Sequence, residues 1–345
     1  MTTQQQPSIF EQHAKKTAVG LLLIIIGLLY LVFFPKWFNN SHTEYEDKSL
    51  KTILTQYYFS RVIDNNVKRF IKLREHEPNK SKPDRPSRNY VKNIPGHLER
   101  RYYAMDIESN GFIAPSAVHE QPDIKVVFLG GSTTECLYMD ADKRFPYLVG
   151  RLLEKKLGLK VNSYNGGVSA NESMHSINIL LNKVLPMKPD MVVMMHNIND
   201  LVMLRLHGNY HYPNSLKSHL QTAKNVFTHV EYPKGLEAIE NEKIAQAFQK
   251  NLEMFIAICK IHQTQPVLMT QANRVEDDDL YHRFNQIIRE TANKNKIILI
   301  DLAKHIPKSL DLIYDHYHYT EIGSNQSAEI IASHLQESIK NTGKS

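Results

Sequence analysis

The sequence predicts an α/β fold, in which a three-layer α/β/α domain surrounds a five-stranded parallel sheet and an N-terminal transmembrane helix precedes it. Three observations lead to this prediction. An uncharged apolar run of membrane-spanning length lies near the amino terminus. Beyond Pro122, short apolar runs alternate with amphipathic helical patterns, as in parallel sheets that are covered on both faces. Loops rich in Gly, Ser and Asn follow several of these apolar runs. Parallel sheets bind ligands beyond the carboxyl ends of their strands, which is where these loops would lie.

The composition is that of an ordinary globular protein with one main domain, since 42% of the 345 residues are hydrophobic and 23% are charged. A net charge of +6 and a pI of about 9.0 favour contact with anionic surfaces such as lipid headgroups or acidic glycans. No nucleic-acid-binding motif accompanies the charge, so we expect no nucleic-acid partner. Cys136 and Cys259 lie far apart without metal-site spacing, which indicates buried free thiols.

After an N-terminal tail, residues 1–16, the apolar run over residues 17–34 is just long enough to cross a bilayer as a helix. We therefore predict a transmembrane anchor. The alternative is a cleaved signal peptide, but the run exceeds the usual hydrophobic region and no small-residue cleavage site follows it. Lysines on the two sides of the run nearly balance, so charge does not decide its orientation.

Residues 35–121 are predicted to hold an amphipathic helix and a basic linker. Apolar residues recur at helical spacing over about 48–74, a pattern of a helix that packs on the following domain or lies on the membrane. Residues 72–101 combine four prolines with excess basic charge, which is typical of an extended linker. This linker is interpreted either as a solvated tether or as a segment attracted to anionic lipid or glycan.

The main domain is predicted over residues 122–342. Short apolar runs indicate five strands, at about 124–130, 159–164, 190–196, 265–270 and 296–301. Apolar residues at helical spacing indicate the helices between and after them, at 145–153, 177–185, about 237–262, 277–294 and beyond Thr320. Because parallel strands place their carboxyl ends at one edge of the sheet, functional side chains are expected just after strands.

Ser132 follows the first strand directly, in the sequence Gly130-Gly131-Ser132, and a helical pattern comes after it. Two glycines permit a sharp turn, and the N–H groups at the start of the helix face a developing oxyanion. This position suits a nucleophile. The alternatives are a turn serine that caps the helix and, more weakly, a phosphate-binding loop, which lacks its Gly-Lys-Ser/Thr ending here.

A serine nucleophile needs a base, and the base needs a partner that fixes its tautomer. Asp315 and His318 lie on a loop between an apolar segment and the last helix. Their three-residue spacing lets the carboxylate turn back onto the imidazole. The alternative is a surface or helix-capping pair, and His316 adds a further histidine nearby. Metal binding by these histidines is disfavoured because no further ligands are apparent, and no cofactor is expected.

Two further loops offer groups that stabilise charge. The second strand leads into Asn165–Asn171, where a glycine turn directs a backbone N–H into the site. The third leads into a loop with Asn199, whose amide donates a hydrogen bond without titrating. Taken singly, these loops are a turn and a helix cap. Polar loops at successive strand ends favour a catalytic site.

These loops resemble, in order, the sequence blocks of the SGNH/GDSL hydrolase family over about residues 122–342. The resemblance implies a flavodoxin-like SGNH hydrolase domain. It implies Ser132 as nucleophile, and Asp315 and His318 as the other members of a catalytic triad. It further implies an oxyanion hole built from the Ser132 N–H, the Ala170 N–H and the Asn199 side chain.

The chain departs from the family pattern at several positions. Gly131 replaces the aspartate of Gly-Asp-Ser, and Thr133 replaces its leucine. Ala170 replaces a glycine, so a left-handed backbone there would be strained by its methyl group. Asn197 also replaces a glycine, and asparagine is among the residues that best tolerate positive φ. Asn199 itself is retained.

Two polar stretches receive no catalytic role. The acidic run at 276–279 resembles a metal cluster, but acids before an amphipathic stretch are better explained as a helix cap. Residues 205–235 form a long insertion after the third block, which either shapes specificity or is surface elaboration.

The resemblance implies a serine hydrolase that cleaves acyl esters, in particular O-acetyl esters, through an acyl-serine intermediate, and the apolar run at 17–34 predicts that it is anchored in a membrane. The anchor and the basic linker favour an envelope polysaccharide as substrate and an extracytoplasmic catalytic domain. Two alternatives stay open, an O-acyltransferase to a sugar hydroxyl and a non-catalytic SGNH scaffold that binds glycan.

Overall fold

The computed structural model describes residues 69–71, 73–211, 220–222, 241–275 and 278–341. These residues belong to one compact unit that begins at Val67. The predicted tail at 1–16 and the predicted anchor at 17–34 lie outside the described residues. Within the described part of the chain, every helix is too short or too polar to cross a membrane. The anchor therefore stays a prediction.

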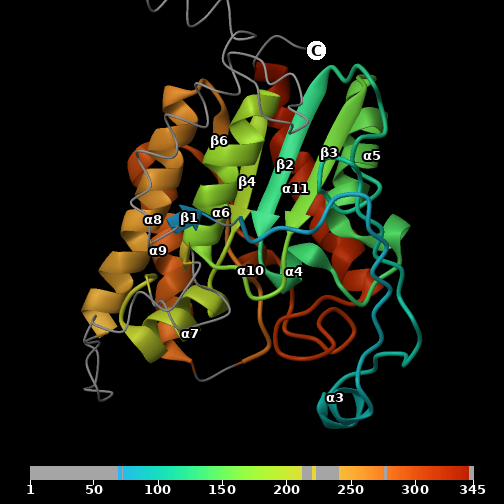
Figure 1. Ribbon diagram of the computed structural model, residues 1–345, viewed down its shortest axis with the longest axis vertical. Helices are drawn as coiled ribbons and strands as arrows, with labels where there is room; N and C mark the ends of the chain where they lie inside the picture. The colour runs from blue at the N-terminus through green and yellow to red at the C-terminus, as the bar shows by residue number, and fades with distance from the viewer. Residues whose placement is uncertain (1–68, 72, 212–219, 223–240, 276–277, 342–345) are drawn as a thin grey trace, which may run out of the picture. The chain divides into compact units, whose positions relative to one another are not determined.

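A parallel sheet of five strands forms the centre of the domain, in the order β3-β2-β4-β6-β7 (Figure 1). The strands are β2 Ile124–Gly130, β3 Val161–Gly167, β4 Met191–Met195, β6 Gln265–Met269 and β7 Ile298–Ile300. All five agree closely with the predicted strands. The register pairs Gly130 with both Gly167 and Met195, so three neighbouring strands end side by side. Their following loops leave from one edge of the sheet.

Helices cover both faces of this sheet, which confirms the predicted three layers (Figure 1). One face carries α6 Ser173–Ile179, α8 Asn241–Ile261 and α9 Asp279–Asn295, and the other carries α5 Phe145–Leu157 and α11 Glu321–Asn341. Alternate residues of β2 serve the two faces: Val127 and Leu129 pack with the first group, and Val126 and Phe128 with the second. All four are buried, as the continuous apolar run predicts.

The remaining elements are short. The helices are α3 Arg88–Asn93, α4 Ser132–Glu135, α7 Ile198–His207 and α10 Leu302–His305, with 3₁₀ turns at Ala141–Lys143 and Leu185–Met187 and a π-helical turn at Leu180–Val184. A separate antiparallel pair joins β1 Arg69–Ile71 to β5 Leu220–Thr222. The predicted helix over 48–74 is therefore wrong at its carboxyl end, where the chain is extended. Its earlier part lies outside the described residues, as does most of the 205–235 insertion.

Residues 73–121 fold against the domain, so the part of the chain predicted as a solvated tether, residues 72–101, is not one over its described residues. Single β-bridges join Asp84 to Tyr103 within the segment and Ile113 to Asn165 in β3. Leu98 and Tyr103 are buried against Tyr314, in the loop before the last helix. The segment thus packs at the edge where the strands end, and α3 lies beyond that edge in Figure 1.

Candidate active site

Ser132 is the first residue of α4, directly after β2. The turn depends on glycine, because a Cβ on Gly130 would lie 2.1 Å from Thr134 Oγ1. The predicted helix after Ser132 is a single turn that ends at Cys136 in the left-handed region, with φ 53°. Its dipole is therefore small, and the local N–H groups matter more than the helix as a whole.

A tight turn brings Asp315 back onto His318, as their spacing predicts. Asp315 Oδ1 accepts hydrogen bonds from the N–H groups of Tyr317 and His318, at 2.8 and 2.7 Å. The other carboxylate oxygen, Oδ2, lies 2.7 Å from His318 Nδ1. The loop is closed by a bridge between Ile313 and Tyr319. The backbone itself therefore fixes the carboxylate that faces the imidazole.

His318 also reaches Ser132, since its Nε2 lies 2.8 Å from Ser132 Oγ. Burial opposes ionisation of Asp315, but the hydrogen bonds and charge of His318 outweigh it and hold the pKa of Asp315 well below its ordinary value. An ionised carboxylate can only accept hydrogen bonds, so His318 Nδ1 carries the proton. In the neutral imidazole, Nε2 is then free to accept the Ser132 hydroxyl proton.

Asn199 lies in the first turn of α7 and points toward the turn before Ser132. Its Nδ2 donates to the backbone oxygen of Asn171 at 2.8 Å, which leaves the second hydrogen of the amide for another acceptor. A Cβ on Gly131 would lie 2.3 Å from this nitrogen. Asn197 has φ −165°, so its replacement of glycine needs no tolerance of positive φ, contrary to the reason given from the sequence.

Ala170 has φ 63°, so the left-handed backbone considered from the sequence is present. For a residue with a Cβ this conformation costs roughly 1–2 kcal/mol. The turn is closed by a hydrogen bond from the Asn171 N–H to the Val168 oxygen at 2.9 Å. Asn171 also contacts Asn199, so the loop that carries Ala170 and the asparagine of α7 form one cluster.

A model of the GDSL-like lipase/acylhydrolase family matches residues 128–325. The chain belongs to this family. The resemblance drawn from the motifs is thereby confirmed, and with it membership of a family of hydrolases.

Similar solved structures include a protein described as a GDSL-like lipase from Parabacteroides merdae, with 17% identity, a TM-score of 0.45 and coverage of 63% of this chain and 97% of that one. An acetylxylan esterase from Geobacillus stearothermophilus has 18% identity, a TM-score of 0.44 and coverage of 61% and 94%. Another acetyl xylan esterase has 21% identity, a TM-score of 0.44 and coverage of 61% and 98%. The search of curated proteins finds no match.

Tyr90 of this GDSL-like chain was not anticipated from the sequence. Its hydroxyl donates a hydrogen bond of 2.7 Å to Asp315 Oδ2. Tyr314 also belongs to the site, since its ring stacks on His318 with centroids 5.9 Å apart and planes 16° apart. Tyr90 lies in the proline-rich basic stretch, where no periodicity or motif singles it out. Tyr314 could have been noticed as the neighbour of Asp315.

Residues that precede the family match hydrogen-bond to the loop that carries Ala170, and the sequence analysis did not single them out either. Arg74 Nη1 donates to Asn171 Oδ1 at 2.9 Å, and Asn171 Nδ2 donates back to the Arg74 oxygen at 3.0 Å. His76 lies 3.1 Å from the Gly167 oxygen and 3.3 Å from the Glu135 carboxylate. The segment before the family match therefore braces the loop that leaves β3.

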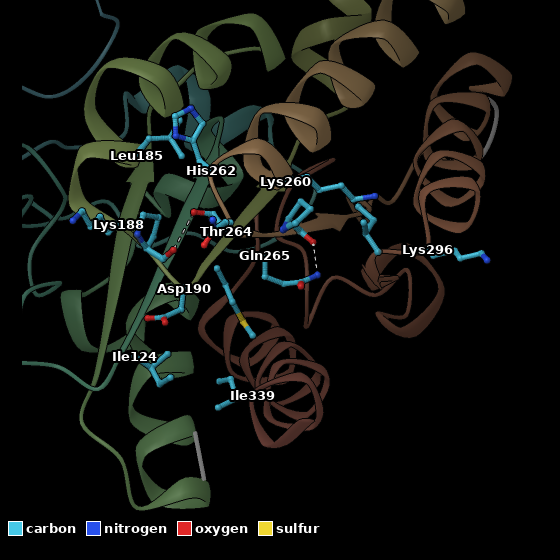
Figure 2. Close-up of a pocket in the computed structure, with 15 residues that line it drawn as sticks. Ile124, Leu185, Lys188, Asp190, Lys260, His262, Thr264, Gln265, Lys296 and Ile339 are labelled. Atoms are coloured by element: carbon cyan, nitrogen blue, oxygen red, sulfur yellow. Dashed lines mark hydrogen bonds between the residues drawn. The ribbon is translucent and has the colours of Figure 1, made fainter. Parts of the chain in front are cut away.

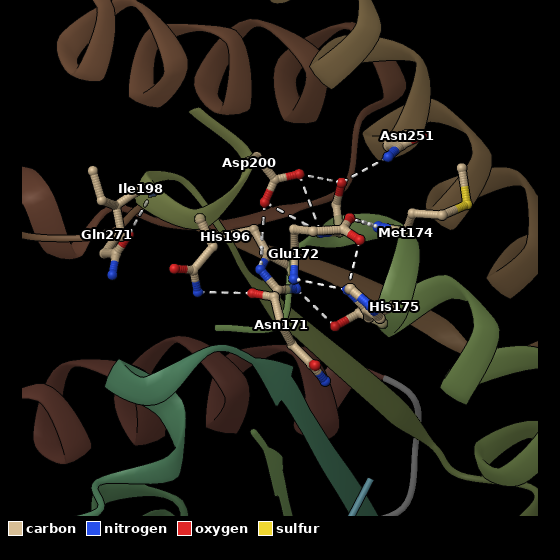
Figure 3. Close-up of polar contacts among 12 residues, drawn as sticks. Asn171, Glu172, Met174, His175, His196, Ile198, Asp200, Asn251 and Gln271 are labelled. Atoms are coloured by element: carbon tan, nitrogen blue, oxygen red, sulfur yellow. Dashed lines mark hydrogen bonds and ion pairs between the residues drawn. The ribbon is translucent and has the colours of Figure 1, made fainter. Parts of the chain in front are cut away.

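A second Ser-His-Asp arrangement is buried, and Figure 3 shows its histidine, His196, and its aspartate, Asp200. Ser176 Oγ is 2.7 Å from His196 Nε2, and His196 Nδ1 is 3.6 Å from Asp200 Oδ2. Ser176 is 1% exposed and Asp200 is fully buried, so no substrate reaches them. Burial lowers the pKa of His196 to about 3, which makes it a poor base. We therefore interpret this arrangement as structural, whereas Ser132 contacts a histidine and is partly exposed.

A large cavity of about 830 Å³ lies at the opposite edge of the sheet (Figure 2). It is lined by Ile124, Met191 and Gln265, the first residues of β2, β4 and β6. Lys188 and Lys296 extend away from each other in Figure 2, so these two amines do not converge on one point. The cavity is therefore separate from the site at Ser132.

Asp278 of the acidic run and the two cysteines lie outside the site and have structural roles. Asp278 caps α9, accepting a hydrogen bond of 3.0 Å from the Tyr281 N–H, which confirms the helix-cap interpretation for this part of the acidic run. Cys136 and Cys259 are buried free thiols, as predicted, and burial raises the pKa of each to about 12.

Proposed function

We propose that the protein is a serine ester hydrolase in which Ser132 is the nucleophile, His318 the base and Asp315 the residue that orients the base. The observation that carries the proposal is the continuous line of hydrogen bonds Ser132–His318–Asp315, with distances of 2.8 and 2.7 Å. A serine hydroxyl becomes nucleophilic when a positioned base takes its proton, and the base works only in the correct tautomer. The ionised state of Asp315 supports that tautomer.

The reaction begins when Ser132 Oγ attacks the acyl carbon and its proton passes to His318 Nε2. The carbonyl oxygen becomes an oxyanion, which accepts hydrogen bonds from the Ser132 N–H, the Ala170 N–H and the Asn199 amide. As the C–O bond to the alcohol breaks, His318 returns the proton to the departing oxygen. Water then attacks the acyl-serine by the same route, which releases the acid and restores Ser132.

We further propose that the substrate is an O-acetyl ester on an envelope polysaccharide and that the catalytic domain lies on the extracytoplasmic side of a membrane. The apolar run at 17–34 supports an anchor, and the net charge of +6 favours an anionic polymer or surface. With a sugar hydroxyl in place of water in the second step, the same acyl-serine would give acyl transfer.

The test is labelling with a fluorophosphonate probe, followed by assays with short acyl esters. The parent should be labelled and should release acid, whereas Ser132→Ala should lose both activities with unchanged folding. Ser176→Ala is the matched control, because it removes another serine hydroxyl that contacts a histidine, and it should keep labelling. An unlabelled parent would favour a non-catalytic scaffold. A product acylated on an added sugar acceptor would favour the transferase.

A further inference from the structure

The carboxylate of Asp315 receives a hydrogen bond from outside the family's part of the chain. Tyr90 lies on α3, well before residue 128, where the family match begins. Its hydroxyl is 2.7 Å from Asp315 Oδ2, the same oxygen that faces His318 Nδ1 at 2.7 Å. The two donors hold one oxygen atom from two sides.

With Tyr90 in place, the acceptor capacity of Asp315 is filled. Oδ1 accepts two backbone N–H groups, from Tyr317 and His318, and Oδ2 accepts the Tyr90 hydroxyl and the imidazole. A carboxylate offers about four lone-pair sites, so each has a donor. Rotation of the carboxylate away from His318 would break hydrogen bonds on both oxygens. The backbone fixes Oδ1, and among the described residues Tyr90 is the donor that fixes Oδ2 independently of the imidazole.

The position of Tyr90 is itself well determined. Ser87 caps α3 by accepting a hydrogen bond of 3.0 Å from the Tyr90 N–H. The Gly96 N–H, just beyond the helix, donates to the Tyr314 oxygen at 2.8 Å. A Cβ on Gly96 would lie 2.4 Å from that oxygen, so this contact requires glycine. The helix is therefore fastened to the loop directly beside Asp315.

Tyr90 also keeps its proton. Burial raises its pKa well above the ordinary value, and the hydrogen bond to Asp315 raises it further. The hydroxyl thus acts only as a donor toward the carboxylate at neutral pH.

We propose that Tyr90 is a positioning residue for catalysis, which acts through Asp315 to hold His318 in line with Ser132. This inference rests on the proposed function of the triad. Tyr90 contacts the triad through its hydrogen bond to Asp315, so its contribution is expected to depend on the carboxylate. On this proposal, α3 supports the triad through Tyr90 from outside the family's part of the chain.

The first experiment compares Tyr90→Phe with Tyr103→Phe in an acyl ester assay. Tyr103 is a matched control, since it is a buried tyrosine of the same cluster whose hydroxyl donates to the Glu99 backbone oxygen at 2.9 Å. Tyr90→Phe should lower kcat on the order of 10-fold, the effect of one hydrogen bond to a charged group, with KM little changed. Tyr103→Phe should keep the parental kcat. Saturating labelling with the probe counts the folded enzyme in each sample.

The second experiment separates positioning from a general structural role by placing Tyr90→Phe in the Asp315→Asn background. If Tyr90 acts through the carboxylate, the second substitution should cause little further loss in the rate of labelling. An equal fold-loss in both backgrounds would overturn the inference, as would a parental kcat for Tyr90→Phe. Failure of the proposed function is distinct, because the parent itself would then lack labelling that depends on Ser132.

Discussion

Gly131 and Asn199 form a matched pair at the centre of the site. The amide of Asn199 occupies the space that a side chain at position 131 would take, with 2.3 Å between Nδ2 and a Cβ built on Gly131. The aspartate that stands here in the family pattern would displace this amide. The departure from Gly-Asp-Ser therefore lets the Asn199 amide approach the turn before Ser132 closely.

This geometry leads to a prediction for Asn199→Ala. A donor to the oxyanion contributes mainly in the transition state, and removal of one such donor costs on the order of 100- to 1,000-fold in kcat. We expect that loss with KM little changed, while Ser132 still reacts with the probe. Steady-state kinetics of the purified variant check this. A parental kcat would mean that Asn199 is only a loop cap, and an unfolded variant would be replaced by Asn199→Gln.

Sequence motifs predicted the residues whose partners lie within a few positions or in known blocks, such as Asp315 and His318. Tyr90 escaped prediction because its partner lies 225 residues away and its own surroundings carry no pattern. For Ala170, the steric argument correctly considered a left-handed backbone, since φ is 63°. For Asn197 the same reasoning was wrong, because the actual φ of −165° is extended.

Among the elements, α6, α7 and α8 are joined by a buried polar network around Asp200 (Figure 3). Asp200 accepts hydrogen bonds from the N–H of Ser173 at 3.1 Å and from the Tyr210 hydroxyl at 2.8 Å. Asn251 of α8 donates to Ser173 Oγ at 2.8 Å. Burial, and next the charge of Glu172, raises the pKa of Asp200 to about 7. Helix periodicity predicts the apolar faces of these helices but not this network.

The raised pKa gives stability a definite pH dependence. Between the unfolded value near 4 and the folded value of about 7, folding takes up a proton at Asp200, so stability falls as pH rises through this range. The slope from one such group is at most about 1.4 kcal/mol per pH unit. Compared with Asp200→Asn, the parent should lose free energy of unfolding as pH rises from about 4 to about 7. Above that range, the difference in free energy of unfolding between the two proteins should be constant. Urea unfolding of both proteins at several pH values measures the difference. A difference independent of pH would contradict the prediction.

At the scale of the whole molecule, the α/β architecture was predictable because strands buried on both faces leave continuous apolar runs between helical patterns. The fold of residues 73–101 was not. Prolines and basic charge look the same in a solvated tether and in a segment held by a few specific contacts. Those contacts, such as Asp84 with Tyr103, depend on distant or non-periodic partners.

The predicted anchor can be tested on a protein that contains residues 1–345. If residues 17–34 span a membrane, the full protein should sediment with membranes and remain there in high salt, because salt weakens surface charge attraction but not apolar insertion. Deletion of residues 1–34 should move the protein to the soluble fraction, whereas Ser132→Ala should leave it with the membranes. Release of the parent by salt alone would indicate attachment through basic charge instead.

The close packing of residues 73–121 also decides where the chain can be cut. A fragment limited to the family match at 128–325 would lack the first half of β2 and most of α11, so the apolar side chains beneath that helix would face water. A fragment over 122–342 would keep these elements but still lack Tyr90 and Arg74. Low activity in either fragment would therefore reflect the loss of residues that pack on the site, not a fault in Ser132, Asp315 or His318. A fragment made for expression should instead begin upstream, near Val67, where the compact unit begins.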